Sequence, residues 1–425
     1  MNEHKVIACV PCKAESRRVP QKNRAFVGGL PLWLRKCQQL RRIDGIHEVW
    51  VDTDSDAIAS LADAMGFKVL RRSPEVNGYD GHQLFAWEVS HLPEASVYVQ
   101  ALCTAPFLSD STIENCIDAI HRGYKYSLVA KSVHGYPLGK YADTIPDSNT
   151  IDGEVYEAMS LYAVDGAEAR STGKRTGVTC STCVISGQQA FDIDYPADLE
   201  HARSIALGEN EREMRFLRGL KPILSSALLS DTLVDLGFTD PCMGDGGLCC
   251  SPTKVFGRAC TMRLEEPMEN DVRSIYDALQ HYSWCMPGNV LCVQAHDGCA
   301  YFGELNASLA LRAGAQGLLI DGLTRDSAEV AALGFPVWSK GGYPFDCREE
   351  LVCADVGAGA SMYGRWVNHG DLIFADADGC VSIPRHMEDE VLQAAIERSE
   401  EEVSIRYGIA CGATVDDILS NNDGF

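Results

Sequence analysis

The sequence has no long hydrophobic run and a deficit of positive charge. No apolar stretch approaches the roughly 20 residues that a membrane-spanning helix needs. No signal-peptide pattern is present in the opening segment MNEHKVIACV, so we expect a cytoplasmic protein without membrane attachment. Lys and Arg total 37 against 60 Asp and Glu, which gives a formal net charge of -23. This balance argues against nucleic-acid binding, and an anionic ligand would need local basic loops.

Cysteine is plentiful, but metal-ligand spacing is lacking. The 18 cysteines are scattered through segments that we expect to be strands and helices. Cys180 and Cys183 form one CxxC spacing, and Cys249 and Cys250 are adjacent, but no second CxxC supplies two further zinc ligands. We therefore expect reduced, partly buried thiols and no structural metal.

The length and the pattern of elements indicate two α/β domains. A chain of 425 residues is long enough for two or three domains. Apolar runs alternate with helical segments through the first half, which is typical of a doubly wound, mostly parallel sheet. A helical pattern from Ala197 to Lys221 then leads into shorter, glycine-rich β segments. We expect domains over residues 1–210 and 223–425, joined by a helical linker over 211–222.

A basic loop follows the first apolar run. The segment PCKAESRRVPQKN, residues Pro11 to Asn23, comes directly after the strand-like run from Val6 to Val10. A solvated basic turn is one interpretation. The other is a ligand loop, because open α/β sheets bind ligands at the carboxyl ends of their strands. The cations Lys13, Arg17 and Lys22 would then neutralise nucleotide phosphates.

Four stretches resemble, in order, the CMP-sialic acid and CMP-Kdo synthetase family. The opening VIACVPCKAESRRVPQKN resembles the family signature PARxxSxRxPxKN, and VWVDTDSDAIASLA resembles its second strand and TDS turn. A glutamine-bearing strand with a Thr-x-Pro loop is matched by VYVQALCTAPFLSDSTI, and the closing DIDxPxDLxxA motif by AFDIDYPADLEHA. The resemblance covers about residues 4–207. It implies a nucleotide-diphospho-sugar-transferase-like fold and transfer of CMP from CTP to a sugar acid, with release of pyrophosphate.

The resemblance also implies roles for individual residues. Lys22 is expected at the α-phosphate of CTP. The residues expected to bind the nucleotide or the acceptor are Lys13, Ser16, Arg17, Asn23, Asp54 and Gln100. Lys13 stands where the family has arginine, and no aspartate follows Gln100 as in the Kdo-activating branch. The acceptor is therefore open between a sialic-acid-like or Kdo-like acid and an aminoalkylphosphonate.

Two aspartates near the end of this domain suit a divalent metal. Asp192 and Asp194 are two apart on an extended segment, so their side chains point to one face. Paired carboxylate oxygens suit Mg²⁺ or Mn²⁺ bridging to phosphate oxygens. The alternative is a helix start before Pro196, with Asp194 or Asp198 as the capping residue.

The second half resembles the RraA-like family, which includes 4-hydroxy-4-methyl-2-oxoglutarate aldolases and oxaloacetate decarboxylases. The signature, an acidic residue and then Arg-Asp after twenty positions, is carried by GELNASLALRAGAQGLLIDGLTRD as Glu304 and Arg325-Asp326. The family usually has aspartate in place of Glu304. Flanking pieces such as VFGRACTM and NHGDLIFADADGCVSIP extend the resemblance over about residues 223–405. It implies an α/β sandwich.

The second resemblance implies metal-dependent chemistry on a pyruvate unit. Mg²⁺ held by Asp326 through waters would polarise a 2-oxo acid, so that an enolate of pyruvate can form. Arg325 would pair with the substrate carboxylate or oxyanion, Glu304 would take part in catalysis, and the backbone N–H groups of Gly303 to Leu305 would stabilise negative charge. A surface ion pair and a plain helix N-terminus are the structural alternatives. An oligomerisation or protein-binding module is the functional one, and we expect a homo-oligomer.

Overall fold

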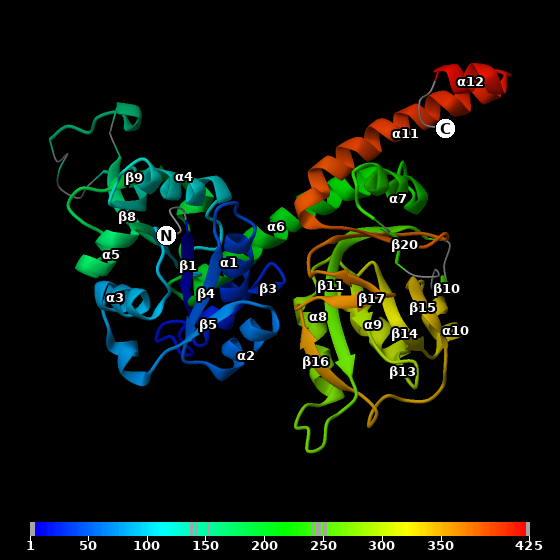
Figure 1. Cartoon of the computed structure of the whole chain (residues 1–425), viewed down its shortest axis with the longest axis horizontal. Helices are drawn as coiled ribbons and strands as arrows, with labels where there is room; N and C mark the ends of the chain where they lie inside the picture. The colour runs from blue at the N-terminus through cyan, green and yellow to red at the C-terminus, as the bar shows by residue number, and fades with distance from the viewer. Residues whose placement is uncertain are drawn as a thin grey trace. The chain divides into compact units, whose positions relative to one another are not determined.

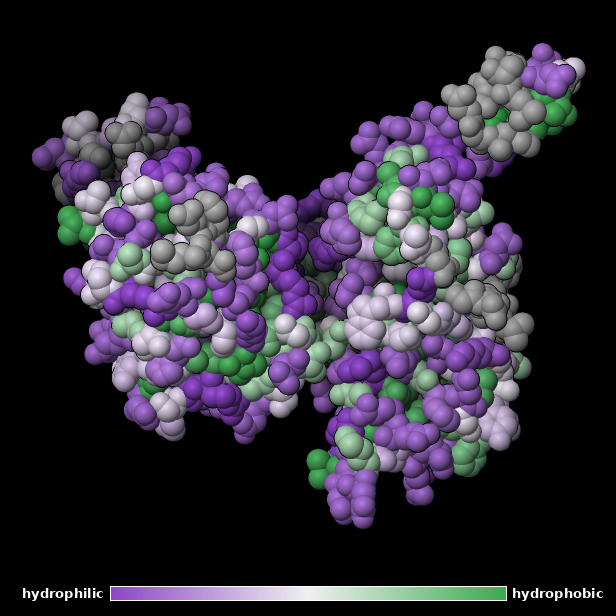
Figure 2. Space-filling view, in the orientation of Figure 1, coloured by the Kyte–Doolittle hydropathy of each residue, from purple (hydrophilic) through white to green (hydrophobic). Residues whose placement is uncertain are grey.

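The computed structural model describes residues 5–136, 140, 143–150, 153–239, 241–243, 248–249 and 253–421. Two compact units, residues 1–206 and 207–425, divide the chain within the long helix α6 (Pro196–Leu220). Figure 1 shows that each unit combines a sheet with helices. Hydrophilic residues cover most of the face of each unit that is visible in Figure 2, as the large acidic excess of the sequence requires.

The first unit is built on a seven-stranded sheet in the order β5-β4-β1-β6-β8-β7-β9. Its strands are β1 (Val6–Pro11), β4 (Glu48–Thr53), β5 (Lys68–Arg71), β6 (Val97–Ala101), β7 (Tyr126–Val133), β8 (Glu154–Asp165) and β9 (Ser181–Ile185). β1 pairs in parallel with β4 and β6, whereas β8 is antiparallel to β6 and β7. The carboxyl ends of β1, β4 and β6 therefore meet at one edge of the sheet.

Helices and a small hairpin complete the first unit. They are α1 (Leu32–Arg41), α2 (Asp56–Ala64), α3 (Gly81–His91), α4 (Asp110–His121), α5 (Gly166–Thr172), and the hairpin β2 (Phe26–Val27) and β3 (Leu30–Pro31). Ile7 and Cys9 of β1 share a core cluster with Phe85 of α3. The residues that alternate with them face the other side, so β1 is buried on both faces.

The second unit is built on a nine-stranded sheet with the main order β10-β15-β14-β12-β11-β19-β20. The strands are β10 (Leu248–Cys249), β11 (Val255–Glu265), β12 (Val290–Gln294), β13 (Ala300–Phe302), β14 (Gly317–Thr324), β15 (Val337–Gly342), β16 (Val352–Val356), β19 (Leu372–Ala375) and β20 (Cys380–Ile383). The central strands β11, β12, β14 and β15 run parallel. The first sheet is mostly parallel, and the second has a parallel centre with antiparallel strands paired to it, which confirms the expected α/β fold class.

Helices of the second unit contribute to one of its core clusters. The helices of this unit are α7 (Ser226–Asp235), α8 (His281–Trp284), α9 (Glu304–Ala313), α10 (Ser327–Ala332), α11 (Glu388–Ala410) and α12 (Val415–Asn421), and a small hairpin joins β17 (Ala360–Met362) to β18 (Arg365–Val367). Leu229 of α7 and Val391 of α11 pack with Phe374 of β19. Within the described ranges, no helix is both long and apolar enough to cross a bilayer.

Most described cysteines are buried as free thiols. Cys180 and Cys183 are partly exposed and lie at the β9 end of the first sheet. Cys250 and the side chain of Cys249 lie outside the described residues. In the part of the chain that the structure describes, no group of three or more His, Cys, Asp or Glu side chains is arranged to hold a metal.

Two histidines that are far apart in the sequence lie close together in the second unit, His281 buried and His369 partly buried. Nε2 of His281 donates to the carbonyl of Cys260 (2.7 Å), and Nδ1 of His369 accepts from the N–H of Thr261 (3.3 Å). The ring of Trp284 meets His369 edge to face. Burial lowers the pKa of His281 to about 4 and the pKa of His369 to about 3. Both rings are therefore neutral at physiological pH.

Acidification should weaken the second unit. Because folding lowers the pKa of each histidine, the unfolded chain takes up the proton first as the pH falls below the unfolded pKa of about 6.5. The folded state therefore loses stability as the pH falls from there toward the folded pKa. Between about pH 7 and pH 5, each histidine should cost about 2 kcal/mol of unfolding free energy. Urea unfolding followed by circular dichroism measures this loss. His281→Gln keeps a donor for Cys260 without a titrating group, and should remove about half of it. An unchanged pH dependence in this variant would contradict the account.

Candidate functional site

The basic loop after β1 is anchored by Asp54. The N–H of Ala14 donates to Oδ1 of Asp54 (2.6 Å), and Nδ2 of Asn77 donates to Oδ2 (2.7 Å). Partial burial raises the pKa of Asp54, but these hydrogen bonds outweigh it and leave the pKa below its usual value. The hydroxyl of Thr53 also donates to the carbonyl of Cys12 (2.6 Å). Asp54 was expected to bind ligand, and in this structure it holds the ligand loop in place.

Three predicted ligand residues have open side chains on this loop. Lys13 and Arg17 are exposed and Ser16 is half-buried. Among the described residues, none of these three side chains has a polar partner. They are therefore available to an anionic ligand, and a triphosphate carries enough charge to engage all of them.

Lys22 joins the loop to the DID segment, which consists of residues Asp192 to Asp194. It lies in a short 3-10 helix (Lys22–Arg24), and its ammonium donates to the carbonyl of Ile193 (2.6 Å) and lies 3.7 Å from Oδ1 of Asp194. Arg18 also pairs with Asp194 (2.6 Å). The Lys22 side chain is 12% exposed, so water screens its charge only in part. The fold thus brings together two predicted groups that lie far apart in the sequence.

Asp192 carries a carboxylate that the protein leaves incompletely compensated. Its Oδ1 is buried and has no hydrogen-bond partner among the described residues. Burial raises the pKa of Asp192; the Thr104 hydroxyl lowers it, and the charge of Asp194 raises it again. The capping role falls on Asp198, whose Oδ2 accepts from the N–H groups of Asp194 and Tyr195. Asp192 is therefore free to bind a divalent cation, and its orphaned oxygen fits one.

Asn23 and Gln100 differ from Lys13, Ser16 and Arg17, because their side chains already bond to other parts of the protein. Nδ2 of Asn23 donates to the carbonyl of Lys13 (2.9 Å), and its Oδ1 accepts from the Cys103 thiol (3.2 Å). Gln100 is fully buried on β6, where Nε2 donates to Glu88 (2.6 Å). Both side chains were expected to contact ligand, and in this structure both connect protein segments with their amide groups.

The predicted residues of the second unit gather at the carboxyl end of β14. Asp326, the residue before α10, lies in the left-handed region (φ 54°), a conformation that is uncommon for residues with a side chain and clusters at functional sites. Its Oδ2 accepts from the N–H of Glu304 at the start of α9 (3.2 Å). A Cβ on Gly303 would lie 2.5 Å from the same oxygen, so the close approach requires glycine. Leu305 follows with an exposed side chain.

This arrangement gives the backbone N–H of Glu304 a different role from the expected one. The Glu304 N–H is occupied by Asp326, so it holds that carboxylate instead of facing a substrate. The Glu304 carboxylate accepts from the hydroxyl of Ser308 (3.1 Å). Arg325 lies 3.9 Å from Asp326 and forms a closer pair with Asp346 (3.1 Å). Sequence reasoning missed Asp346, although its place just beyond a parallel strand, β15, was a signal for it.

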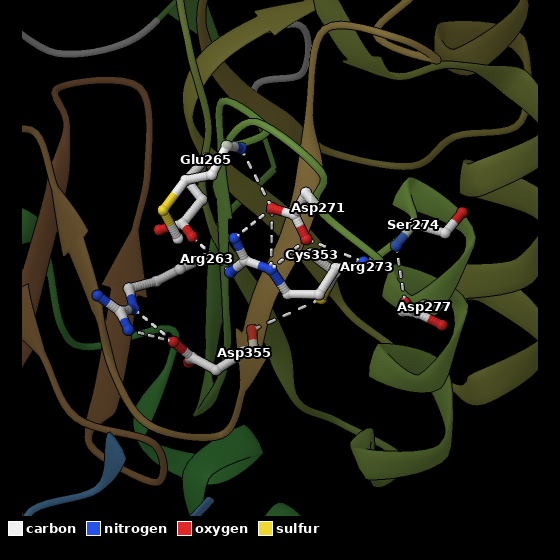
Figure 3. Close-up of polar contacts among 9 residues, drawn as sticks. Arg263, Glu265, Asp271, Arg273, Ser274, Asp277, Cys353 and Asp355 are labelled. Atoms are coloured by element: carbon white, nitrogen blue, oxygen red, sulfur yellow. Dashed lines mark hydrogen bonds and ion pairs between the residues drawn. The ribbon is translucent and has the colours of Figure 1, made fainter. Parts of the chain in front are cut away.

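A second polar cluster at the end of β11 was also missed. Figure 3 shows that Arg273 reaches back to Asp271 and to Glu265, and that Arg263 pairs with Asp355. Burial raises the pKa of Asp355, and the Arg263 charge lowers it. The Arg273 pairs tie the loop after β11 to the end of that strand, and the pair of Arg263 with Asp355 joins β11 to β16. They lie within one loop and one strand pair, so we assign them to the support of the fold.

Comparison with known proteins separates the two units. A family model described as Cytidylyltransferase matches residues 7–176, and one described as Aldolase/RraA matches residues 226–382. The N-acylneuraminate cytidylyltransferase B of Danio rerio is 30% identical, over 36% of this chain and 40% of its own length. The 3-deoxy-manno-octulosonate cytidylyltransferase of Anaeromyxobacter dehalogenans is 28% identical, over 47% of this chain and 97% of its own.

A relative of the second unit comes from Halalkalibacterium halodurans. It is named "Putative 4-hydroxy-4-methyl-2-oxoglutarate aldolase" and is 30% identical, over 27% of this chain and 56% of its own length. The chain thus spans about half, or less, of the length of the zebrafish and Halalkalibacterium proteins. These matches confirm both family resemblances that the sequence motifs indicated.

Proposed function

Because the chain joins a cytidylyltransferase-family domain to an RraA-like domain, we propose that it combines two activities on related acids. The first unit transfers CMP from CTP to a small acid and releases pyrophosphate. The second is a metal-dependent aldolase or decarboxylase for 2-oxo acids. One observation carries the first proposal: the ammonium of Lys22 lies against the Asp192–Asp194 segment, 3.7 Å from Asp194.

The proposed transfer needs positive charge around the α-phosphate. An acceptor hydroxyl loses its proton to solvent and forms a bond to the α-phosphorus, the bond to the β-phosphate oxygen breaks, and pyrophosphate leaves with the electron pair. Lys13, Ser16 and Arg17 hold the triphosphate, and Lys22 lies at the α-phosphate, where charge accumulates. Mg²⁺ or Mn²⁺, held by the DID carboxylates, would supply further neutralisation of the phosphate oxygens. The acceptor proposed is a sialic-acid-like or Kdo-like acid, with an aminoalkylphosphonate as the alternative.

Loss of the Lys22 ammonium should therefore damage the transfer step. We expect Lys22→Ala to lower pyrophosphate release by about two to three orders of magnitude, the usual effect of removing one key charge-stabilising group. A coupled pyrophosphate assay measures this. Lys125→Ala removes a surface partner of Asp165 and serves as the control. A folded Lys22→Ala protein with wild-type activity would remove Lys22 from the site.

The proposed metal role of Asp192 can be separated from a helix-start role. Asp192→Asn should raise the Mg²⁺ concentration needed for half-maximal activity, because one carboxylate charge at the cation is lost. Asp198→Asn is the matched variant, since its side chain caps α6. It should lower the melting temperature and leave the Mg²⁺ requirement unchanged. If wild type and Asp192→Asn need the same Mg²⁺ concentration for half-maximal activity, Asp192 and Asp194 only form the start of a helix and do not hold the metal.

The second proposal rests on Arg325 and Asp326 beside Gly303. The orientation of Asp326 by the Glu304 N–H supports it as the group that would hold Mg²⁺, which would polarise the oxygen of a 2-oxo acid. Arg325 binds the substrate carboxylate in exchange for its half-exposed pair with Asp346. A ring of RraA-like domains without catalysis, or a protein-binding role, is the competing possibility.

A shared substrate would explain why the two units are fused. The open form of a 3-deoxy-2-oxo sugar acid is a 4-hydroxy-2-oxo acid. Aldol cleavage breaks its C3–C4 bond: the C4 hydroxyl loses a proton, C4 becomes an aldehyde, and C3 takes up a proton to give pyruvate. The second unit would then make or break the acid that the first unit activates. Fusion raises the local concentration of such an intermediate.

Pyruvate release tests this link directly. With Mg²⁺ and the preferred acid of the first unit, wild type should release pyruvate, measured with a coupled dehydrogenase. Arg325→Ala and Asp326→Ala should abolish it and leave cytidylyl transfer intact, because both residues lie in the second unit. Release from oxaloacetate alone would indicate a decarboxylase without a shared substrate. Turnover of neither compound would favour the non-catalytic scaffold.

A further inference from the structure

Arg175 occupies a prepared position in the first unit. It lies between α5 and β9, and its side chain is 17% exposed. Its backbone N–H donates to Nδ1 of His82 (3.3 Å). A Cβ on Gly81, the first residue of α3, would lie 2.5 Å from the guanidinium carbon. Because glycine alone leaves this space, α3 and the loop position the guanidinium together.

The guanidinium is oriented but weakly paired. It stacks over the ring of Tyr162, 4.1 Å from the ring centre, and this contact sets its plane. Its hydrogen bond to Oε1 of Gln100 is 3.3 Å long, and its ion pair with Glu157 is 3.9 Å long. Strong arginine–carboxylate bonds are about 2.7–2.9 Å long. Arg175 therefore retains donors for an oxyanion from outside the protein.

Arg175 lies beside the proposed reaction centre. Its partner Gln100 is near the carboxyl end of β6, and the ring that it stacks on, Tyr162, is the residue of β8 that pairs with Gln100. Just beyond β6, the carbonyl of Thr104 accepts from the N–H of Ile193 (2.9 Å), the residue between Asp192 and Asp194. Strand β6 and the short segment after it thus connect Arg175 to the residues that would hold the cation.

We propose that Arg175 binds the carboxylate of a 2-oxo-3-deoxy sugar acid, the acceptor of the proposed transfer. The planar fork of arginine matches the two oxygens of a carboxylate. Glu157, which is 39% exposed, accepts a hydrogen bond from an acceptor hydroxyl. An aminoalkylphosphonate has no carboxylate, and its one acidic group, the phosphonate, is the group that would react, so Arg175 favours the sugar acid. This assignment rests on the proposed function of the first unit.

Calorimetric titration of the full chain tests the assignment through the carboxylate itself. The probes are N-acetylneuraminate, 3-deoxy-manno-octulosonate and their methyl esters, each with Mg²⁺ present. Wild type should bind at least one acid more tightly than its ester. Arg175→Met should weaken acid binding about 10- to 100-fold, the effect of one charged hydrogen-bonded pair, and abolish the difference between acid and ester. Arg175→Lys, which keeps the charge without the fork, should be intermediate.

Two further variants guard against a purely structural effect. Lys174→Met removes an exposed neighbouring charge and should leave acid binding unchanged. Gly81→Ala keeps the charge but places a methyl group against the guanidinium, so acid binding should weaken while the melting temperature stays near wild type. An acid–ester preference that survives Arg175→Met, or is absent from wild type, overturns the inference.

Binding and catalysis fail separately. If pyrophosphate is released from CTP but the affinity for the acid does not depend on Arg175, the assignment of Arg175 is wrong and the proposed transfer stands. If acid binding depends on Arg175 but no acceptor yields pyrophosphate, the proposed transfer is wrong and the binding site remains.

Discussion

The contact of the Lys22 ammonium with the segment from Asp192 to Asp194 is the constraint on which the first unit's site depends. Lys22 leaves the loop after β1 and reaches the Ile193 carbonyl and Asp194, just before α6 begins. Opposite charges attract strongly where water screens them only in part. The contact ties the loop to the segment before α6, and Oδ1 of Asp192 has no hydrogen-bond partner in the part of the chain that the structure describes. Lys22 and Arg18 thus compensate Asp194, and Asp192 is the carboxylate that we propose to hold the metal.

Sequence patterns predicted what depends on local spacing. The alternation of apolar runs and helical segments predicted a mostly parallel sheet in the first unit, because each pattern reflects burial along one element. The motifs placed Lys22 and Asp192 in one site, and the fixed interval from Glu304 to Arg325 placed those residues at neighbouring loop ends. Strands that run parallel deliver their following loops to one edge, so such sites can be predicted before the packing is known.

Side-chain partners could not be predicted in the same way. Gln100 sits in a ligand-like motif but points into a buried network, where its amide donates to Glu88, whose pKa burial raises above its usual range. Its other end meets Arg175, which has room only because residue 81 is glycine. Asp346 reaches Arg325 from a separate loop. These contacts depend on the directions of side chains from distant elements, and no local spacing encodes them.

The central claim is that the first unit activates a small acid with CTP. The most direct test is pyrophosphate release by the full chain with CTP and Mg²⁺, measured across N-acetylneuraminate, 3-deoxy-manno-octulosonate and 2-aminoethylphosphonate. The account predicts release that requires an acceptor, with one CMP conjugate formed for each pyrophosphate, and a sugar acid as the best substrate. Absence of release with every acceptor, or equal release without any, would contradict it.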